Sequence, residues 1–288
     1  MNRGIDHLVL PVADLDRAIE AYSAFGFTTT PRAVHPFGTG NSLVQLQGNF
    51  LELLAVLDET KFPPPAPGVF DFGRFNESFL AAREGFSMLV FEGHDVQGDR
   101  AAFADNGLQT YDPFHFERKA TLPDGDQVTV GFSLAFVTDP RMPEAAFFTC
   151  QQHAPQYFWK PEYQSHPNGA QVVAEVVMVA EDPADLSGLY AGLQGPDAVS
   201  ASADGLTVAT ARGAVAVLTP DRFADRFGTP SPGPDSPHFA AFRVAVKDLT
   251  QAEALLRDNG VAIRKAGGRL QIAPDAACGV ALEFSAGD

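Results

Sequence analysis

Hydrophobic and polar positions change from strand spacing to helical spacing within the first 30 residues. Residues 5–12 are rich in leucine and β-branched side chains, which predicts a strand. After Asp14, a typical N-terminal cap, apolar side chains recur at helical spacing over residues 15–25. Gly26 predicts the end of this helix. Three short strands are expected next, at residues 27–30, 42–47 and 49–56. The first unit therefore has the order βαβββ.

The same order of elements recurs three more times along the chain. In the second copy, strands are expected at residues 86–91, 128–137 and 146–151, with a helix at 95–106. Each copy has an apolar strand, an aspartate before a helix, and an apolar strand at its close; these aspartates are Asp14, Asp95, Asp182 and Asp248. Because an internal repeat determines the architecture, we predict an α+β fold of four tandem βαβββ modules.

A segment rich in proline, glutamine and aromatic residues, 150–170, separates the second and third copies. We place the domain boundary there, which predicts an N-terminal domain of residues 1–155 and a C-terminal domain of residues 168–288, each with two modules. The loop "YFWKP" in this segment favours packing between the domains over a ligand platform. The stretches "KFPPPAPGVF" and "GTPSPGPDSP" are typical of surface connectors between modules.

Charge and composition exclude several kinds of partner. The formal net charge is −16, so the surface field repels nucleic acid and anionic membranes. No apolar run reaches membrane-spanning length, and the N-terminus lacks the pattern of a secretion signal, which predicts a cytoplasmic protein. The two cysteines, Cys150 and Cys278, are too few for a disulfide framework.

Two polar residues lie on predicted strand faces that are otherwise apolar. His7 shares a face with Ile5 and Val9, and Glu52 alternates with apolar residues in the same way. A buried carboxylate must pair, protonate or bind something. If the first and last strands of the unit are neighbours, His7 and Glu52 point into one cavity, and imidazole with carboxylate suits Fe, Mn, Ni or Zn. A core histidine bonded to a backbone carbonyl or to Glu52 is the structural alternative for His7.

Several short motifs carry a family resemblance. They are "IDHLVL" with His7, "NFLELLAV" with Glu52, the stretch "HPFGTGNSLVQLQGNFLELLAV", "RKATLPDG" and "HPNGA". Together with the repeat, they resemble the vicinal oxygen chelate superfamily of glyoxalases, extradiol dioxygenases and fosfomycin resistance proteins, and its glyoxalase-like domain proteins in particular. The resemblance implies that pairs of βαβββ modules form half-barrels of the glyoxalase/dioxygenase type, so that four modules make two half-barrel domains. It also implies a divalent metal ion that chelates vicinal oxygens of a substrate.

The resemblance assigns His7 and Glu52 as metal ligands and leaves the rest of the ligand set open. In the second module Met88 stands where a second first-strand ligand is expected, and the closing strand offers Thr149, Cys150 and Gln151 instead of glutamate. The candidates that could complete the set are His35, His94, His115 and His153. A turn cap before Pro36 explains His35 equally well.

Arg118 is a further candidate for the site, as a bidentate partner for a substrate carboxylate. Its neighbours Glu117 and Lys119 are also typical of a solvated strand edge. In the C-terminal half, Glu175 and Glu283 align with His7 and Glu52. Two carboxylates alone make a poor transition-metal site, so we interpret this half as a scaffold or a worn duplicate.

The expected function is that of a divalent-metal-dependent lyase or isomerase acting on a small oxygenated, partly apolar metabolite in the N-terminal cavity. Glu52 would act as ligand or general base, with His35 and Arg118 as further catalytic candidates. A ring-cleaving extradiol-type dioxygenase is the alternative enzyme, and it needs two histidines and one carboxylate around Fe(II). A non-catalytic small-molecule binding protein is the alternative that the missing second-module ligands favour. A polar side chain such as His35 or Gln151 beside both His7 and Glu52 would support catalysis by metal. Such half-barrels often form homodimers, and four modules in one chain also allow the pairing internally.

Overall fold

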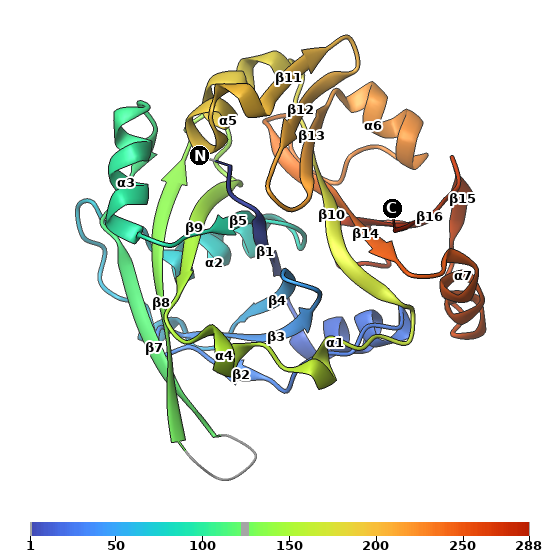
Figure 1. The fold of residues 1–288 in the computed structure, drawn as a ribbon, viewed down its shortest axis with the longest axis horizontal. Helices are drawn as coiled ribbons and strands as arrows, with labels where there is room; N and C mark the ends of the chain where they lie inside the picture. The colour runs from blue at the N-terminus through green and yellow to red at the C-terminus, as the bar shows by residue number, and fades with distance from the viewer. Residues whose placement is uncertain (1, 122–126, 288) are drawn as a thin grey trace.

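The computed structural model describes residues 2–121 and 127–287, which form two curled sheets flanked by helices (Figure 1). Sheet A, a half-barrel, contains β1 (Ile5–Pro11), β2 (Ala33–Val34), β3 (Thr39–Gln45), β4 (Phe50–Val56), β5 (Met88–Glu92), β6 (Gln109–Thr110), β7 (Phe114–Thr121), β8 (Gln127–Thr138) and β9 (Ala146–Gln152). Their order is β2-β3-β4-β1-β5-β9-β8-β6, and β7 pairs with β8. The helices of this half are α1 (Leu15–Ala24), α2 (Phe72–Ala82) and α3 (Val96–Asp105), with a short η1 (Glu59–Lys61).

Sheet B repeats this arrangement in the second half of the chain. It contains β10 (Ala170–Val179), β11 (Val199–Ser202), β12 (Gly205–Ala209), β13 (Ala214–Leu218), β14 (His238–Val246), β15 (Arg264–Ala266), β16 (Arg269–Ile272) and β17 (Ala281–Ala286). Their order is β11-β12-β13-β10-β14-β17-β16-β15. The helices are α5 (Ser187–Gln194), α6 (Pro220–Phe227) and α7 (Leu249–Asp258), with η3 (Pro183–Leu186) and η4 (Pro196–Ala198). The predicted α+β fold of four βαβββ modules in two half-barrels is confirmed.

The four predicted aspartates all cap the element that follows the first strand of their module. Asp14 accepts hydrogen bonds from the backbone N–H groups of residues 16 and 17, and Asp248 from those of residues 250 and 251. Asp95 and Asp182 accept one such bond each. A carboxylate in this place satisfies backbone donors that the first turn leaves unpaired, so the repeat in sequence corresponds to a repeated local structure.

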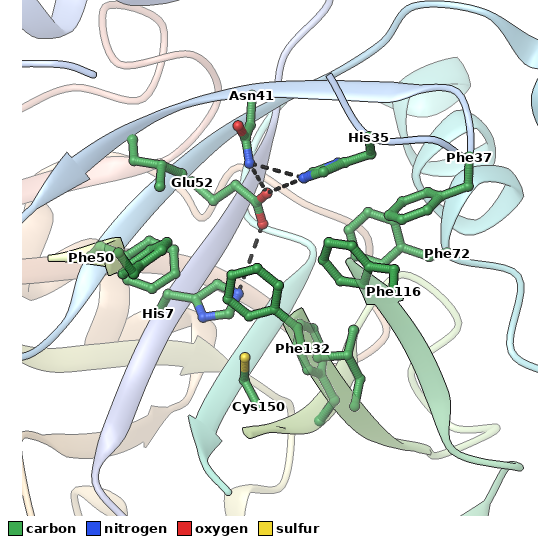
Figure 2. A pocket seen from close by; sticks show the side chains of 14 residues that line it. His7, His35, Phe37, Asn41, Phe50, Glu52, Phe72, Phe116, Phe132 and Cys150 are labelled. Carbon is green, nitrogen blue, oxygen red and sulfur yellow. Dashed lines mark hydrogen bonds and ion pairs between the residues drawn. The ribbon is translucent and has the colours of Figure 1, made fainter. Parts of the chain in front are cut away.

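Both faces of the strands β1, β3 and β4 of sheet A are buried. Along β4, Leu51 and Leu53 join a hydrophobic core that includes residues of both halves, whereas Phe50 and Leu54 belong to a separate cluster inside the half-barrel. Glu52 lies between Phe50 and Leu54 on the same face of β4, so it also faces the interior of the half-barrel (Figure 2). This two-residue period therefore separates the residues that hold the halves together from those that line the interior.

Two details of the first module differ from expectation. The prediction of a strand at residues 27–30 is wrong. The backbone N–H of Thr30 donates to the Leu43 carbonyl, but the Leu43 N–H donates to the side-chain hydroxyl of Thr30 instead of to a backbone carbonyl, so no strand pairing forms. Ile5 does not share the face of His7, because the register between β1 and β5 shifts between these residues. Ile5 instead joins the core that both halves share.

Helices α2 and α6 were not predicted. Each lies between two modules, α2 after the stretch "KFPPPAPGVF" and α6 before "GTPSPGPDSP". Asp71 and Thr219 cap them, and buried phenylalanines face the protein interior from both. The connectors are therefore partly helical, and Phe72 of α2 reaches the interior of sheet A.

The segment that joins the halves contains α4 (Pro155–Phe158) and η2 (Pro161–Tyr163). The division into domains of residues 1–155 and 168–288 stays a prediction. Among residues 2–121 and 127–287, no helix has the length and apolar character needed to cross a membrane.

Candidate functional site

The interior of sheet A contains a cavity of about 50 Å³. Seven of the described side chains that line it are phenylalanines, and the polar ones include His7, His35, Asn41 and Glu52 (Figure 2). His7 and Glu52 come from β1 and β4, which pair in parallel, with Val9 opposite Glu52. The condition set by the sequence, that the first and last strands of the module be neighbours, is therefore met.

The ring of His7 is held from two sides. Its Nδ1 lies 2.5 Å from Asp6 Oδ1, and its face stacks on Phe50 with the ring centroids 4.3 Å apart. An ionised carboxylate can only accept, so the proton is on Nδ1 and the Nε2 lone pair faces the cavity. Gln152 donates to the second oxygen of Asp6 at 3.2 Å. The sequence places Asp6 beside His7, but the pairing depends on the register shift next to Ile5.

Glu52 lies between two histidines, as Figure 2 shows. Its Oε2 is 3.8 Å from His7 Nε2, and its Oε1 is 3.9 Å from His35 Nε2. Asn41 Nδ2 donates to Glu52 Oε1 at 2.6 Å. The carboxylate is only 6% exposed, so this amide is important in compensating its lost hydration.

His35 lies in the turn between β2 and β3, with its Nδ1 2.8 Å from Thr39 Oγ1 and its Nε2 3.2 Å from Asn41 Nδ2. Since Asn41 Nδ2 is a donor, the proton of His35 is on Nδ1, and Nε2 is the acceptor. The ring stacks on Phe37 at 4.9 Å between centroids. The structure therefore brings His35 to the same carboxylate as His7, whereas Gln151 accepts from Val96 N–H at the start of α3 and does not line the cavity.

The other candidate ligands do not reach this cavity. His115 and His153 both contact the hydroxyl of Ser133, at 2.7 and 2.6 Å, while the neighbouring Phe132 lines the cavity. His94 lines a different cavity. Arg118 lies on β7 opposite Val130, and its side chain falls outside the described residues.

Cys150 also lines the cavity. Burial, together with the negative charges of Asp6 and Glu52, raises the pKa of the Cys150 thiol well above its ordinary value. In the metal-free protein the thiol is therefore protonated, and its sulfur forms part of the cavity wall.

The donor types in the cavity fit a divalent transition metal. Imidazole nitrogen and carboxylate oxygen each bind such ions at about 2.1 Å, which puts two ligand atoms on one ion roughly 3 to 4 Å apart. The distances of Glu52 to His7 and His35 agree with that spacing. Among the residues that the structure describes, no group of three or more His, Cys, Asp or Glu side chains is arranged as a complete metal site. The pair of His7 and Glu52 thus fits in chemistry, and the third ligand is the open point.

In the C-terminal half, the two glutamates that align with His7 and Glu52 bind an arginine. Nη2 of Arg226, from α6, pairs with Glu175 and with Glu283, the latter at 2.6 Å. Gln271 donates to the other oxygen of Glu283 at 2.8 Å. Burial acts to raise the pKa of Glu283, but Arg226, Gln271 and Arg269 together lower it below its ordinary value. This internal ion pair supports the interpretation of the C-terminal half as a scaffold.

The sequence matches the model of the glyoxalase-like domain over residues 5–194, which is well over half of the chain. The chain belongs to the glyoxalase-like domain family. The predicted resemblance is thereby confirmed, and the matched region of this glyoxalase-like protein includes all the described cavity residues. A search of curated proteins finds no match.

Solved structures share the fold of the glyoxalase-like protein at low sequence identity. A hypothetical protein from Staphylococcus aureus has a TM-score of 0.68 at 12% identity, with 99% of each chain covered. A 2,3-dioxygenase from Pseudomonas sp. KL28 has a TM-score of 0.59 at 11% identity, covering 99% of this chain and 92% of that one. A mutant of 4-hydroxymandelate synthase from Streptomyces coelicolor has a TM-score of 0.58 at 14% identity, covering 100% and 94%. At these identities the likeness concerns the fold alone.

Proposed function

We propose that the N-terminal cavity is the active site of a divalent-metal-dependent lyase or isomerase that acts on a small, partly apolar oxygenated metabolite. One observation carries the proposal: the Nε2 of His7 and the carboxylate of Glu52 face the same buried, aromatic cavity. Asp6 and Asn41 hold these two groups in place. Buried polar groups held by hydrogen bonds to a second set of residues are the usual design of a metal site.

His7 and Glu52 would hold the ion, and His35 is the proposed third ligand because its Nε2 approaches the same carboxylate. Binding the ion would require His35 Nε2 to give up the hydrogen bond from Asn41, which would keep its bond to Glu52. Zn, Fe, Mn and Ni all accept such donors. When bound, the ion supplies Lewis-acid stabilisation for oxygen atoms of the substrate that become negatively charged.

The protein groups would supply the remaining functions. The phenylalanines bind the apolar part of the substrate and exclude water, which strengthens charge interactions inside the cavity. Glu52 acts either as a ligand or, through the oxygen that faces His7, as the base that takes a proton from substrate carbon. Arg118 is retained as a candidate for binding a substrate carboxylate. All these residues lie within the predicted N-terminal domain.

A second candidate is a ring-cleaving dioxygenase of extradiol type. The specific observation in its favour is that two histidines and one carboxylate, His7, His35 and Glu52, meet in one cavity. That donor set is the one used by non-haem Fe(II) oxygenases. The sequence offered His35 as one of four histidines that could complete the set and did not single it out, since His35 lies in a turn and not on a first strand of a module.

A substrate screen distinguishes the candidates. Protein reconstituted separately with Fe, Mn, Ni and Zn is incubated with vicinal diones, hemithioacetals and catechols, and products are identified by mass spectrometry. Conversion without oxygen uptake supports the lyase or isomerase, whereas oxygen uptake with catechols supports the dioxygenase. No conversion with any metal, combined with tight binding of an apolar compound, would favour the non-catalytic binding protein.

Replacing Asp6 with asparagine is expected to weaken metal binding by about 10- to 100-fold, because partners of a ligating histidine have effects of this size. Asparagine keeps the shape of the side chain but removes the charge that keeps the proton on His7 Nδ1. Competition with a chromogenic chelator measures the affinity. An unchanged affinity would show that the Asp6 pair does not support a metal ligand.

A further inference from the structure

A second cavity of about 230 Å³ adjoins the first. The two cavities share the side chains of Asn41, Leu43 and Phe158. The first cavity, at about 50 Å³, has room for only a few water-sized groups beside His7 and Glu52. A metabolite with more atoms must therefore extend beyond it, and the neighbouring cavity is the space that shares its walls.

The wall of the second cavity is formed in part by residues 155–163, here called the strap. The strap contains α4 and η2 and passes close to the edge strands β2 and β3 (Figure 1). Gln45 of β3 fastens it: its Nε2 donates to the Phe158 carbonyl at 2.9 Å, and its Oε1 accepts from the Lys160 N–H at 3.0 Å. Gln45 is 2% exposed, so these hydrogen bonds are shielded from solvent and hold the backbone of Lys160 beside the cavity.

The charges that line the second cavity are unusual for this chain. The whole sequence has 36 acidic and 20 basic residues, yet the described residues that line the cavity include Arg32 and Lys160 and no Asp or Glu. Arg32 forms an ion pair with Asp16 on the exposed side, so its guanidinium already has a partner outside the cavity lining. Lys160 forms no ion pair with any residue in the described part of the chain. The local excess of one positive charge matches a monoanion.

Two tyrosines add hydrogen-bonding capacity at the same place. Tyr157 and Tyr163 of the strap line the cavity together with Lys160. Phenolic hydroxyls both donate and accept, so they suit the oxygens of an anionic ligand. A carboxylate is a monoanionic group whose two oxygens can accept from an ammonium and a hydroxyl at once.

We propose that the second cavity is the subsite for a carboxylate of the substrate, with Lys160 as its partner and the apolar part of the same molecule in the cavity of His7 and Glu52. The substrate is therefore an aromatic or aliphatic carboxylic acid that carries its reacting oxygens at the other end. This inference rests on the proposed function only for where the reaction occurs. The binding of the carboxylate follows from the strap itself.

Calorimetry with chelator-treated, metal-free protein tests the subsite. The probes are 3-phenylpropanoate and its neutral amide, which have nearly the same shape. The parent is expected to bind the acid about tenfold more tightly than the amide, because a charge-assisted hydrogen bond exceeds a neutral one. The variant Lys160→Met should lose this preference, Lys160→Arg should keep it, and the exposed control Lys247→Met should match the parent.

Each outcome bears on the subsite alone, because no metal is present during the titration. Equal binding of both probes to the parent, or no binding of either, would overturn the proposal. Retention of the preference by Lys160→Met would also overturn it. If the proposed metal site is wrong, a separate metal-binding measurement shows no bound metal, while the preference for the acid in this titration is unchanged. The two proposals can therefore fail separately.

Discussion

Replacement of Arg226 with alanine is expected to lower the free energy of unfolding by about 3 kcal/mol, since it removes the nearest counter-charge of the buried Glu283 carboxylate. Arg226 pairs with both Glu175 and Glu283, and the side chain of Glu283 is only 1% exposed. The remaining partners, Arg243 and Arg269, lie farther from Glu283, at 3.9 and 3.1 Å. Urea unfolding followed by circular dichroism measures the change.

Arg222→Ala is the matched control on the same helix, α6. Its ion pair with Asp204 is exposed on both sides, so its loss should cost less than about 1 kcal/mol. Adding Glu283→Gln to Arg226→Ala should restore part of the stability, because it removes a buried charge that has lost its nearest partner. Equal stability of Arg226→Ala and Arg222→Ala would contradict the ion-pair account.

The lowered pKa of Glu283 adds a dependence on pH. A carboxyl group whose pKa is lower in the folded than in the unfolded chain stabilises the fold above its unfolded pKa, and this contribution is lost as pH falls through the folded pKa. The parent should therefore lose stability progressively as the pH falls below 4.5, the ordinary pKa of a glutamate side chain. Arg226→Ala should lose less over that range, because its Glu283 no longer has the depressed pKa.

Replacement of Glu52 with glutamine is expected to weaken metal binding by more than the roughly 10- to 100-fold that a supporting residue contributes. Glutamine has the same shape and can still bond to Asn41, so the fold should be retained. Turnover of any substrate found in the screen should fall with it, because the variant lacks both a ligand and a base.

Glu20→Gln is a suitable control for Glu52→Gln, since Glu20 is exposed on α1 and far from the cavity lining. Both variants are titrated with metal in competition with a chromogenic chelator. The same affinity in Glu52→Gln and in the parent would show that this carboxylate is not a ligand, and would leave it as a base or as a structural residue.

The repeated modules could be predicted from sequence because their signals are local. An aspartate cap, a helical apolar period and a glycine or asparagine at the end occur within some 15 residues of each other in the first module. His7 and Glu52 were also accessible, since a polar residue among apolar neighbours on a strand is visible in the period of two. Parallel pairing of β1 and β4 then brought them together.

Other parts of the site depend on contacts between distant residues. His35 reaches Glu52 only because the turn between β2 and β3 folds back over β4, which no local pattern expresses. Asn41 is two residues from Leu43 on β3 and shares its face, so the inward position of Asn41 could have been found from the same two-residue period. An alignment of the modules could not identify Arg226, because α6 lies outside the repeat.

The aromatic loop of the strap, whose composition favoured packing between the domains over a ligand platform, also lines cavities. Phe158 lines both cavities of the N-terminal half, and Lys160 lines the second. Composition alone could not distinguish the two roles, since both use large aromatic side chains. The deciding contacts are those of Gln45, more than 100 residues earlier in the chain.

Metal content is the most direct test of the central claim that His7 and Glu52 form a metal-dependent site. Tag-free parent protein, His7→Ala and the exposed control His94→Ala are reconstituted in turn with Fe, Mn, Ni and Zn, desalted, and measured by plasma mass spectrometry. We predict near-stoichiometric metal in the parent and in His94→Ala, and its loss in His7→Ala. Absence of metal from the parent after every reconstitution, or equal metal in His7→Ala, would contradict the claim.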